Sequence, residues 1–375
     1  MLNLGLVMIL FNFYSEGLNR LAQIVNNPTA NSYFADALKI TDLHLFLKNY
    51  LTNIPTLLLH SQVHPPGPIV LFYLTNITGL KLHLNPPLFS AFVVAFLASC
   101  TAIPVYFLAK EFYSEAVARI AVLLCPLIPA MLFFIPLLDV IYGFFFISII
   151  LFYTLGDKNK KSIYFILSGF IWALSLFFSW LFLLVPLVLL ILLFLLYFSK
   201  NEKQKKLFSF QNLLKTNGYF LLTAILFWLI YWLIFGYNIY DLYRATMIYH
   251  HDFLATRSYK IWLFLNLFDF FVFLGIPLAL VYLFGLGKEI TNLIQKKLIN
   301  VPFWLFTLTI IILDLTGKNR SETARIWLFL MPLALIPIAN YIFQTKNKNV
   351  IVFLVIFLLL LQLLIFQKFI MVVWF

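Results

Sequence analysis

Long apolar runs, separated by short polar or basic stretches, recur along the whole of this 375-residue chain. A helix needs about 20 apolar residues to cross the hydrocarbon core of a bilayer, and backbone in lipid has to satisfy its hydrogen bonds within the helix. The pattern therefore predicts an all-α, polytopic transmembrane protein with about 11 spans. The expected spans lie near residues 1–14, 87–109, 117–138, 140–155, 163–179, 181–198, 218–236, 262–286, 301–316, 326–343 and 350–373.

The composition leaves no room for a soluble domain. Hydrophobic residues make up 63% of the chain and charged residues only 11%, whereas soluble domains carry about 25% charged residues. We therefore expect residues 1–375 to form a single membrane domain. The net charge of +12 indicates membrane orientation rather than nucleic-acid binding, because many of the lysines cluster in short loops between apolar runs.

The basic loops all fall on one side when the expected spans alternate in direction, and the positive-inside rule assigns that side to the cytoplasm. We expect a multi-pass protein, in the plasma membrane, whose long loop 15–86, loop 237–261 and link 317–325 face outward. The basic residues on the inner side are Lys110, Arg119, Lys158, Lys160, Lys161, Lys200, Lys203, Lys205, Lys206, Lys215, Lys288, Lys296, Lys297, Lys346 and Lys348.

The outer face mixes acids with bases and histidines, which a loop that is merely solvated does not need. A polar site at the outer membrane surface is the natural hypothesis. The residues in question are Asp36, Asp42, His44, His60, His64, His83, Asp139, Asp241, Arg244, His250, His251, Asp252, Arg257, Arg320, Glu322 and Arg325.

Two prolines directly follow His64 in the outer loop. Pro65 and Pro66 interrupt a helical hydrogen-bond ladder, so a new helix is expected to begin there with His64 at its start. The apolar run at about 69–80 is too short to span, and we expect it to lie in the outer membrane interface. Alternatively, the prolines only turn the chain and His64 is an ordinary interfacial residue.

The order of these features resembles the GT-C membrane glycosyltransferases, more narrowly the branch of protein O-mannosyltransferases and lipid A aminoarabinose transferases. The likeness covers about residues 30–200 and weakens afterwards. It rests on Asp36 within NSYFAD (31–36), the His-Pro-Pro element, the basic-aromatic LAKEFY (108–113) closing the second span, a third span rich in small residues and broken by proline, Asp139 at its outer end, and the basic loop 157–161.

This resemblance implies transfer of a sugar from a polyprenyl-phosphate donor in the membrane lipid to an unidentified acceptor on the extracytoplasmic side. An attacking hydroxyl needs a carboxylate base. The resemblance gives that role to Asp36, with Asp42 as the fallback, and makes Asp139 a candidate for substrate binding. The alternative for Asp36 is an exposed loop acid paired with Lys39, one helical turn further on.

A leaving phosphate needs cations at the outer headgroup level. Arg320 and Arg325 are candidates to hold its oxygens, with Glu322 fixing one arginine; alternatively, Arg325 only anchors the start of a span. His250 and His251 are candidates to donate to the phosphate or to orient a sugar. Adjacent histidines lack the spacing of a helical zinc pair, so no metal site and no cofactor are expected. A divalent cation is compatible with the reaction but unsupported by the residues.

Asp269 and Asp314 fall inside expected spans. An ionisable group at that depth is often functional, but a partner on a neighbouring helix satisfies it equally well. We leave both acids outside the predicted site.

Two other functions compete with the transferase. The first is a transporter or flippase of a lipid-linked or anionic substrate; transporters tend to bind near the bilayer midplane between broken helices, whereas these charges gather at one surface. The second is a non-catalytic protein of the GT-C-like fold, which the short apolar run 1–14 keeps open.

Overall fold

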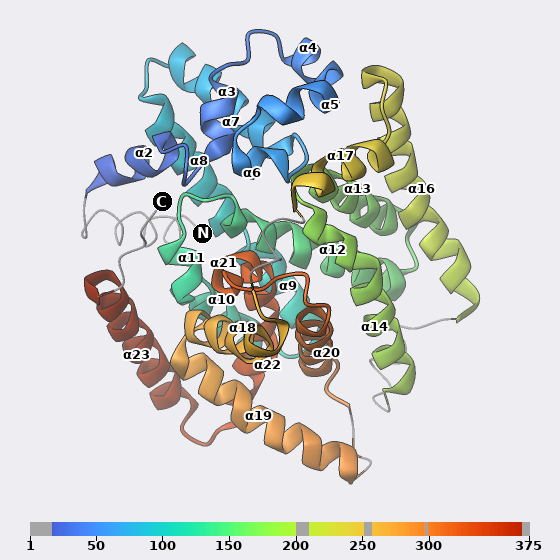
Figure 1. Ribbon diagram of the computed structural model, residues 1–375. Helices are drawn as coiled ribbons and strands as arrows, with labels where there is room; N and C mark the ends of the chain where they lie inside the picture. Colours follow the sequence, from blue (N-terminus) through green and yellow to red (C-terminus); the bar gives the residue numbers. More distant parts are fainter. Residues whose placement is uncertain (1–16, 200–209, 251–256, 296, 298, 370–375) are drawn as a thin grey trace.

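The computed structural model describes residues 17–199, 210–250, 257–295, 297 and 299–369, and every regular element in these ranges is a helix (Figure 1). Side chains are described from residue 217 to 249 in the second of these ranges. The expectation of an all-α chain is confirmed for this part of the protein.

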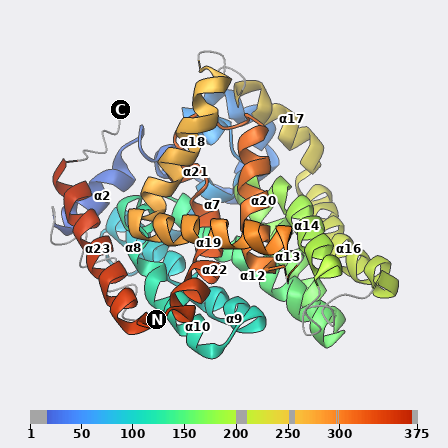
Figure 2. The ribbon, with the colours of Figure 1, turned by 90° about the horizontal axis from the view of Figure 1, so that it is seen from below.

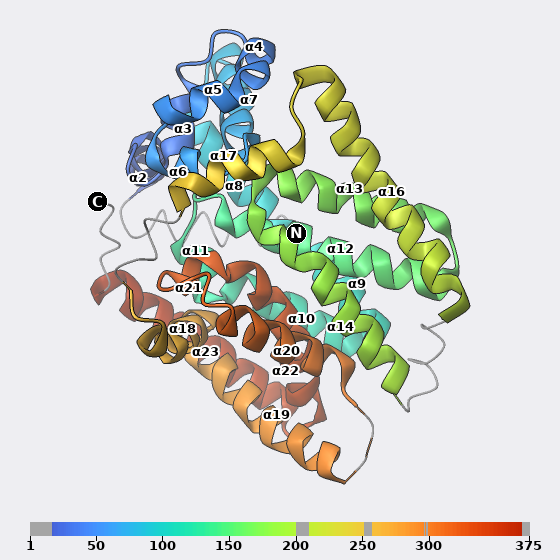
Figure 3. The same ribbon diagram turned by 45° about the vertical axis from the view of Figure 1, so that its right-hand side comes forward.

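The first outer loop folds into a set of short helices that cover one side of the molecule, at the top of Figures 1 and 3. Pro68 in the first turn begins the longest of them, and the side chain of Asp42 caps α4 by accepting from the N–H of Leu45. The helices are α2 (Leu18–Asn26), α3 (Ser32–Ala37), α4 (Leu43–Lys48), α5 (Tyr50–Asn53), η1 (Ile54–Thr56), α6 (Leu59–Gln62) and α7 (Gly67–Lys81).

Five helical segments in the described residues are long and apolar enough to cross a membrane, or six if one bent pair counts as a span. The chain is thus an integral membrane protein. About 11 spans are not confirmed, and the expected span 1–14 lies outside the described residues. The five segments are α8 (Pro86–Ser99) with α9 (Ala102–Phe112), α12 (Asp139–Asn159), η3 (Trp180–Leu184) with α14 (Val185–Phe198), α16 (Phe210–Phe235) and α23 (Lys348–Phe369).

Shorter apolar helices complete the bundle. They are α13 (Ser162–Phe178), α20 (Val301–Leu315) and η5 (Leu328–Leu330) with α22 (Met331–Gln344). α12 and α22 form its centre. Every residue of α22 from Met331 to Ile342 is buried, and 72% of the membrane-spanning stretch of α12 is buried inside the protein, more than in any of the other four segments. α12 packs against α8, α9, α13 and η5.

Two expected spans do not form the single helix that their hydropathy predicts. Residues 117–138 divide into α10 (Glu115–Leu124), η2 (Cys125–Leu127) and α11 (Pro129–Phe133), because Pro126 and Pro129 remove backbone donors. Residues 262–286 divide into α18 (Tyr259–Leu274) and α19 (Ile276–Ile294), which meet at 116° (Figure 2). Gly275 makes this bend with a φ of 115°, where a side chain would be strained.

The two sides of the bundle differ in what they carry. α17 (Ile239–His250) lies beside α2–α7 on the upper side, whereas α14 and α19 end on the opposite side (Figures 1 and 3). Lys158, in the last turn of α12, pairs with Glu111 near the end of α9, with 2.6 Å between Nζ and Oε2. The molecule therefore has one end capped by the outer-loop helices and another where helix ends carry lysine.

We expect Gly169→Ala to destabilise the protein by about 1–3 kcal/mol, the usual cost of overpacking. A Cβ at Gly169 of α13 would lie 2.2 Å from the carbonyl oxygen of Phe220 in α16, so the two helices would have to separate. Thermal unfolding in detergent measures the effect. Gly218→Ala on α16 is the matched control, because a Cβ there meets nothing within 4 Å; equal unfolding temperatures for the two variants would contradict the prediction.

Candidate functional site

Arg325 lies in a group of charged side chains from distant parts of the chain. It belongs to the single turn α21 (Thr323–Ile326), and its side chain is 19% exposed. Its Nη2 donates to Oε2 of Glu322 at 2.6 Å, and its Nε lies 3.8 Å from Oδ2 of Asp139, the first residue of α12. We call these three residues the Arg325 cluster. The link 317–325 and the most buried span therefore meet at one set of ion pairs.

The link reaches this position through contacts with Asn266 of α18. The amide Nδ2 of Asn266 donates to the carbonyl of Asn319 at 3.0 Å, and its Oδ1 accepts from the N–H of Ser321 at 3.2 Å. Ser321 and Glu322 adopt φ values of 93° and 56°, which residues other than glycine rarely adopt. Such backbone persists only where surrounding contacts fix it, and Asn266 supplies them.

The two acids left outside the predicted site also hold the link. Asp269 accepts from the N–H of Ala324 at 2.8 Å and from the hydroxyl of Thr323 at 3.1 Å. Asp314 accepts from Nδ2 of Asn266 at 3.0 Å. These carboxylates thus have partners on the link and on a neighbouring helix, and their contacts position α21.

Arg320 lies in the same link but has a different set of contacts. Its guanidinium donates to the carbonyls of Arg257 at 2.7 Å and Gly317 at 3.3 Å, and it lies 5.7 Å from the ring centroid of Tyr259. Arg257 donates in return to the carbonyl of Arg320 at 2.5 Å and to the hydroxyl of Ser321. These contacts tie the link to the start of α18, and substrate binding by Arg320 stays a prediction.

Two residues of the outer-loop helices interact electrostatically with the Arg325 cluster. Burial raises the pKa of the Tyr33 hydroxyl, the Asp139 carboxylate adds to this, and Arg325 opposes it. Burial lowers the pKa of His60, as does the positive charge of Arg325, while Glu322 acts in the opposite direction. α3 and α6 therefore bring side chains close to the cluster.

Tyr33 and His60 are additions to the predicted site. Tyr33 precedes Asp36 by one helical turn, and His60 precedes His64 by four residues. The spacing of Tyr33 and Asp36 is a signal that the sequence offered, because both lie in α3 and residues three apart share a helix face; His64 lies beyond the end of α6, so this signal does not apply to His60.

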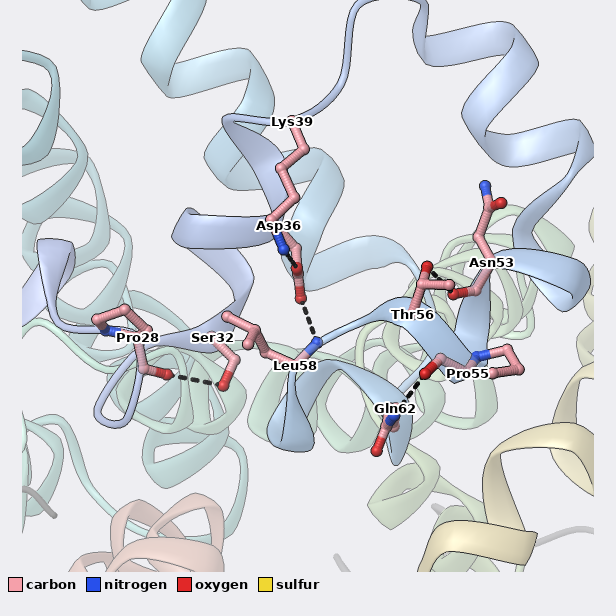
Figure 4. A network of polar contacts seen from close by, with 9 residues as sticks. All are labelled: Pro28, Ser32, Asp36, Lys39, Asn53, Pro55, Thr56, Leu58 and Gln62. Atoms are coloured by element: carbon pink, nitrogen blue, oxygen red, sulfur yellow. Dashed lines mark hydrogen bonds and ion pairs between the residues drawn. The ribbon is translucent and has the colours of Figure 1, made fainter.

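Asp36 is buried in α3, with both carboxylate oxygens in contact with donors (Figure 4). Oδ1 accepts from Nζ of Lys39 at 2.8 Å, and Oδ2 accepts from the N–H of Leu58 at 2.9 Å. The side chain of Asp36 is 0% exposed and that of Lys39 is 60% exposed. The pair with Lys39 is thus present, but the acid is not the exposed one of the alternative interpretation.

His64 lies between α6 and α7, where its ring meets the ring of Tyr33 edge-on at a centroid distance of 5.7 Å. Its carbonyl accepts from the hydroxyl of Tyr50 at 3.0 Å. A Cβ at Gly67 would lie 2.3 Å from the carbonyl oxygen of Phe177, so α7 begins in close backbone contact with the end of α13. Tyr33 therefore contacts His64 and interacts electrostatically with the Arg325 cluster.

The predicted substrate contacts of His250 and His251 stay predictions. His250 ends α17, and its side chain lies outside the described residues, as does the whole of His251. Within the ranges that the structure describes, no three His, Cys, Asp or Glu side chains are grouped to hold a metal ion.

No family model and no curated protein matches the sequence. Among solved structures, the chain is similar to the oligosaccharyltransferase of Archaeoglobus fulgidus, whose crystal structure is a complex with Zn and sulfate. The TM-score is 0.49 and the sequence identity 16%, and the match covers 82% of this chain. It covers 43% of that protein, so the chain spans less than half of its length. This similarity assigns no activity or residue role to the chain.

We expect the protein to lose stability as the pH falls below neutrality, and His60→Gln to reduce this loss. Because the pKa of His60 is lowered in the folded state, the unfolded chain binds the proton more readily. The contribution of neutral His60 to the free energy of unfolding is present above the ordinary histidine pKa of about 6.5. It is lost as the pH falls through that value toward the lowered pKa of the folded state.

Thermal unfolding in detergent at a series of pH values tests this expectation. His44→Gln replaces an exposed histidine of α4 and is the matched control. Parallel pH curves for the wild type and His60→Gln would refute the role of His60.

Proposed function

We propose that the chain is a GT-C-type membrane glycosyltransferase that moves a sugar from a polyprenyl-phosphate donor to an acceptor on the extracytoplasmic side. The observation that supports this most strongly is the position of Arg325. Its guanidinium lies beside Asp139 at the start of α12 and interacts electrostatically with Tyr33 and His60 of the outer-loop helices, and its side chain is only partly exposed to water.

Arg325 suits the leaving group of this reaction. A departing phosphate gains negative charge, and a fixed cation in a poorly solvated place stabilises that charge more than one in water. A guanidinium can pair two oxygens of one phosphate. The side chain of Arg325 is 19% exposed, and the contacts of α18 with the link fix its backbone. In this proposal Arg325 binds the phosphate of the donor.

Asp36 is the proposed base for the acceptor hydroxyl. Oδ2 can keep its hydrogen bond from the N–H of Leu58 while Oδ1, which now accepts from Lys39, accepts from the hydroxyl instead. Lys39 is the exposed partner, and in this proposal the acceptor displaces its ammonium to reach the carboxylate. Tyr33 shares α3 with Asp36, contacts the ring of His64 and interacts electrostatically with Asp139 and Arg325, so in this proposal Tyr33 and His64 help to hold the sugar.

The break between α18 and α19 is the feature that would favour a transporter, because transporters bind their substrates at broken helices. The three atoms nearest to a Cβ at Gly275 would belong to Leu359, Pro129 and Leu278, which are apolar. Gln362 of α23 accepts from the N–H of Ile276 and donates to the carbonyl of Val272, both at 2.8 Å. The break is therefore closed by a side chain, and we prefer the transferase.

We expect Asp36→Asn to lower sugar transfer by about 10²-fold or more, the usual contribution of a general base. The assay uses membranes that contain the full chain and a polyprenyl-phosphate sugar, with the amount of protein measured in parallel. The amide keeps an oxygen for Leu58 but removes the basic carboxylate.

Asp42→Asn is the matched control, because asparagine caps a helix as well as aspartate does and α4 should remain intact. Transfer that survives Asp36→Asn would remove Asp36 as the base. Loss in Asp42→Asn alone would move the role to Asp42, and no transfer by the wild type with any donor would overturn the proposed function.

A further inference from the structure

The Arg325 cluster contains more negative than positive charge. Arg325 carries one positive charge, whereas Asp139 and Glu322 together carry two negative charges. Two like charges that pair with the same guanidinium repel each other, most strongly where water is excluded. A phosphate that approached the cluster in this state would meet an arginine already surrounded by anions.

We propose that Glu322 occupies on Arg325 the place of a phosphate group and is displaced from it when that group binds. This inference rests on the proposed function only for the identity of the anion as a phosphate. It changes the predicted role of Glu322 from a fixed support of the arginine to an internal ligand that competes with substrate.

The exposures of the two acids indicate which one leaves. The side chain of Glu322 is 51% exposed and that of Asp139 is 25% exposed. A carboxylate left in contact with protein and without its counter-ion is costly, whereas the pairing of a half-exposed one is worth little. Glu322 can turn into solvent, while Asp139 stays beside Arg325 as its permanent counter-ion.

The backbone around Glu322 allows a side-chain movement without opening of the link. Ser321 is held by Asn266 on one side, and Thr323 and Ala324 are held by Asp269 on the other. Glu322 itself contacts Arg325 through its carboxylate, at the end of a flexible side chain. The displacement is therefore a rotation of Glu322 within a link of constant shape.

A phosphate can form more hydrogen bonds with the guanidinium of Arg325 than Glu322 forms. Nη2 is the atom that donates to Glu322, and Nε is buried without a hydrogen-bond partner among the described residues, 3.8 Å from Asp139. A tetrahedral phosphate presents several oxygens to the two edges of a guanidinium. Exchange of one carboxylate contact for two phosphate contacts is the driving force that we assign to the displacement.

The test is a binding measurement on the purified full chain in nanodiscs, with farnesyl phosphate and inorganic phosphate as separate probes. We expect Glu322→Gln to bind a probe up to about fivefold more tightly than the wild type, since an exposed ion pair that competes is worth up to about 1 kcal/mol. Glu115→Gln is the matched control. It removes a similarly exposed glutamate that pairs with Arg119 at 2.7 Å on α10, far along the chain from the Arg325 cluster.

Tighter binding of farnesyl phosphate alone supports displacement by a lipid phosphate, and a similar gain for inorganic phosphate supports displacement by a free phosphate. Equal or weaker binding by Glu322→Gln overturns the inference, as does a lack of binding by both forms. Sugar transfer by a wild type whose affinity matches that of Glu322→Gln would leave the proposed function intact. A gain in affinity without any transfer would leave the displacement intact and remove the proposed function.

Discussion

Many buried charged and hydrogen-bonding groups in this apolar chain are stabilised by partners that the protein itself supplies. Lipid offers none, and an unpaired polar group in an apolar medium costs several kcal/mol. The break between α18 and α19 is one example. There Gln362 of α23 accepts a hydrogen bond from the N–H of Ile276 and donates one to the carbonyl of Val272. Asp36 is another, because the buried carboxylate bridges a lysine and a backbone N–H. Polar side chains therefore stabilise places where the helices of this bundle break or meet.

The same requirement builds the candidate site. Asn266 and Asp269 lie in a helix, and their partners lie in the link that follows α20. Because these contacts occur on both sides of Glu322, the left-handed backbone there is held in place, and α21 directs Arg325 toward Asp139. Asp269 and Asp314, the two acids inside expected spans, thus help to position the site without belonging to it. Rigidity of this kind is what electrostatic stabilisation requires, since donors that need not reorganise are the effective ones.

The sequence predicts those features that depend on neighbours along the chain. Hydropathy indicates the apolar helices, and a spacing of three residues indicates the pair of Asp36 with Lys39. The contact of Asp36 with Leu58 depends on how the short helices of the outer loop pack together. No pattern of neighbouring residues predicts that packing. The pairing of Asp139 with Arg325 joins two segments far apart in sequence, so the sequence supplied both residues as candidates but not their contact. The break between α18 and α19 escaped prediction because hydropathy averages over Gly275, whose backbone makes the bend.

Buried polar clusters alone do not identify a site in this protein, as the group around Glu289 of α19 makes clear. Glu289 is 3% exposed, and its Oε1 accepts from the hydroxyl of Tyr341 and from Nδ2 of Asn300 at 3.3 Å. There two neutral donors bind one oxygen of the acid and join α19 to α22 and to the start of α20, which is a packing contact. The Arg325 cluster differs because two acids share one base and one of them is half exposed. Another anion can replace one of the two carboxylates that share the guanidinium of Arg325. This possibility distinguishes the Arg325 cluster, as a place for ligand exchange, from the group around Glu289.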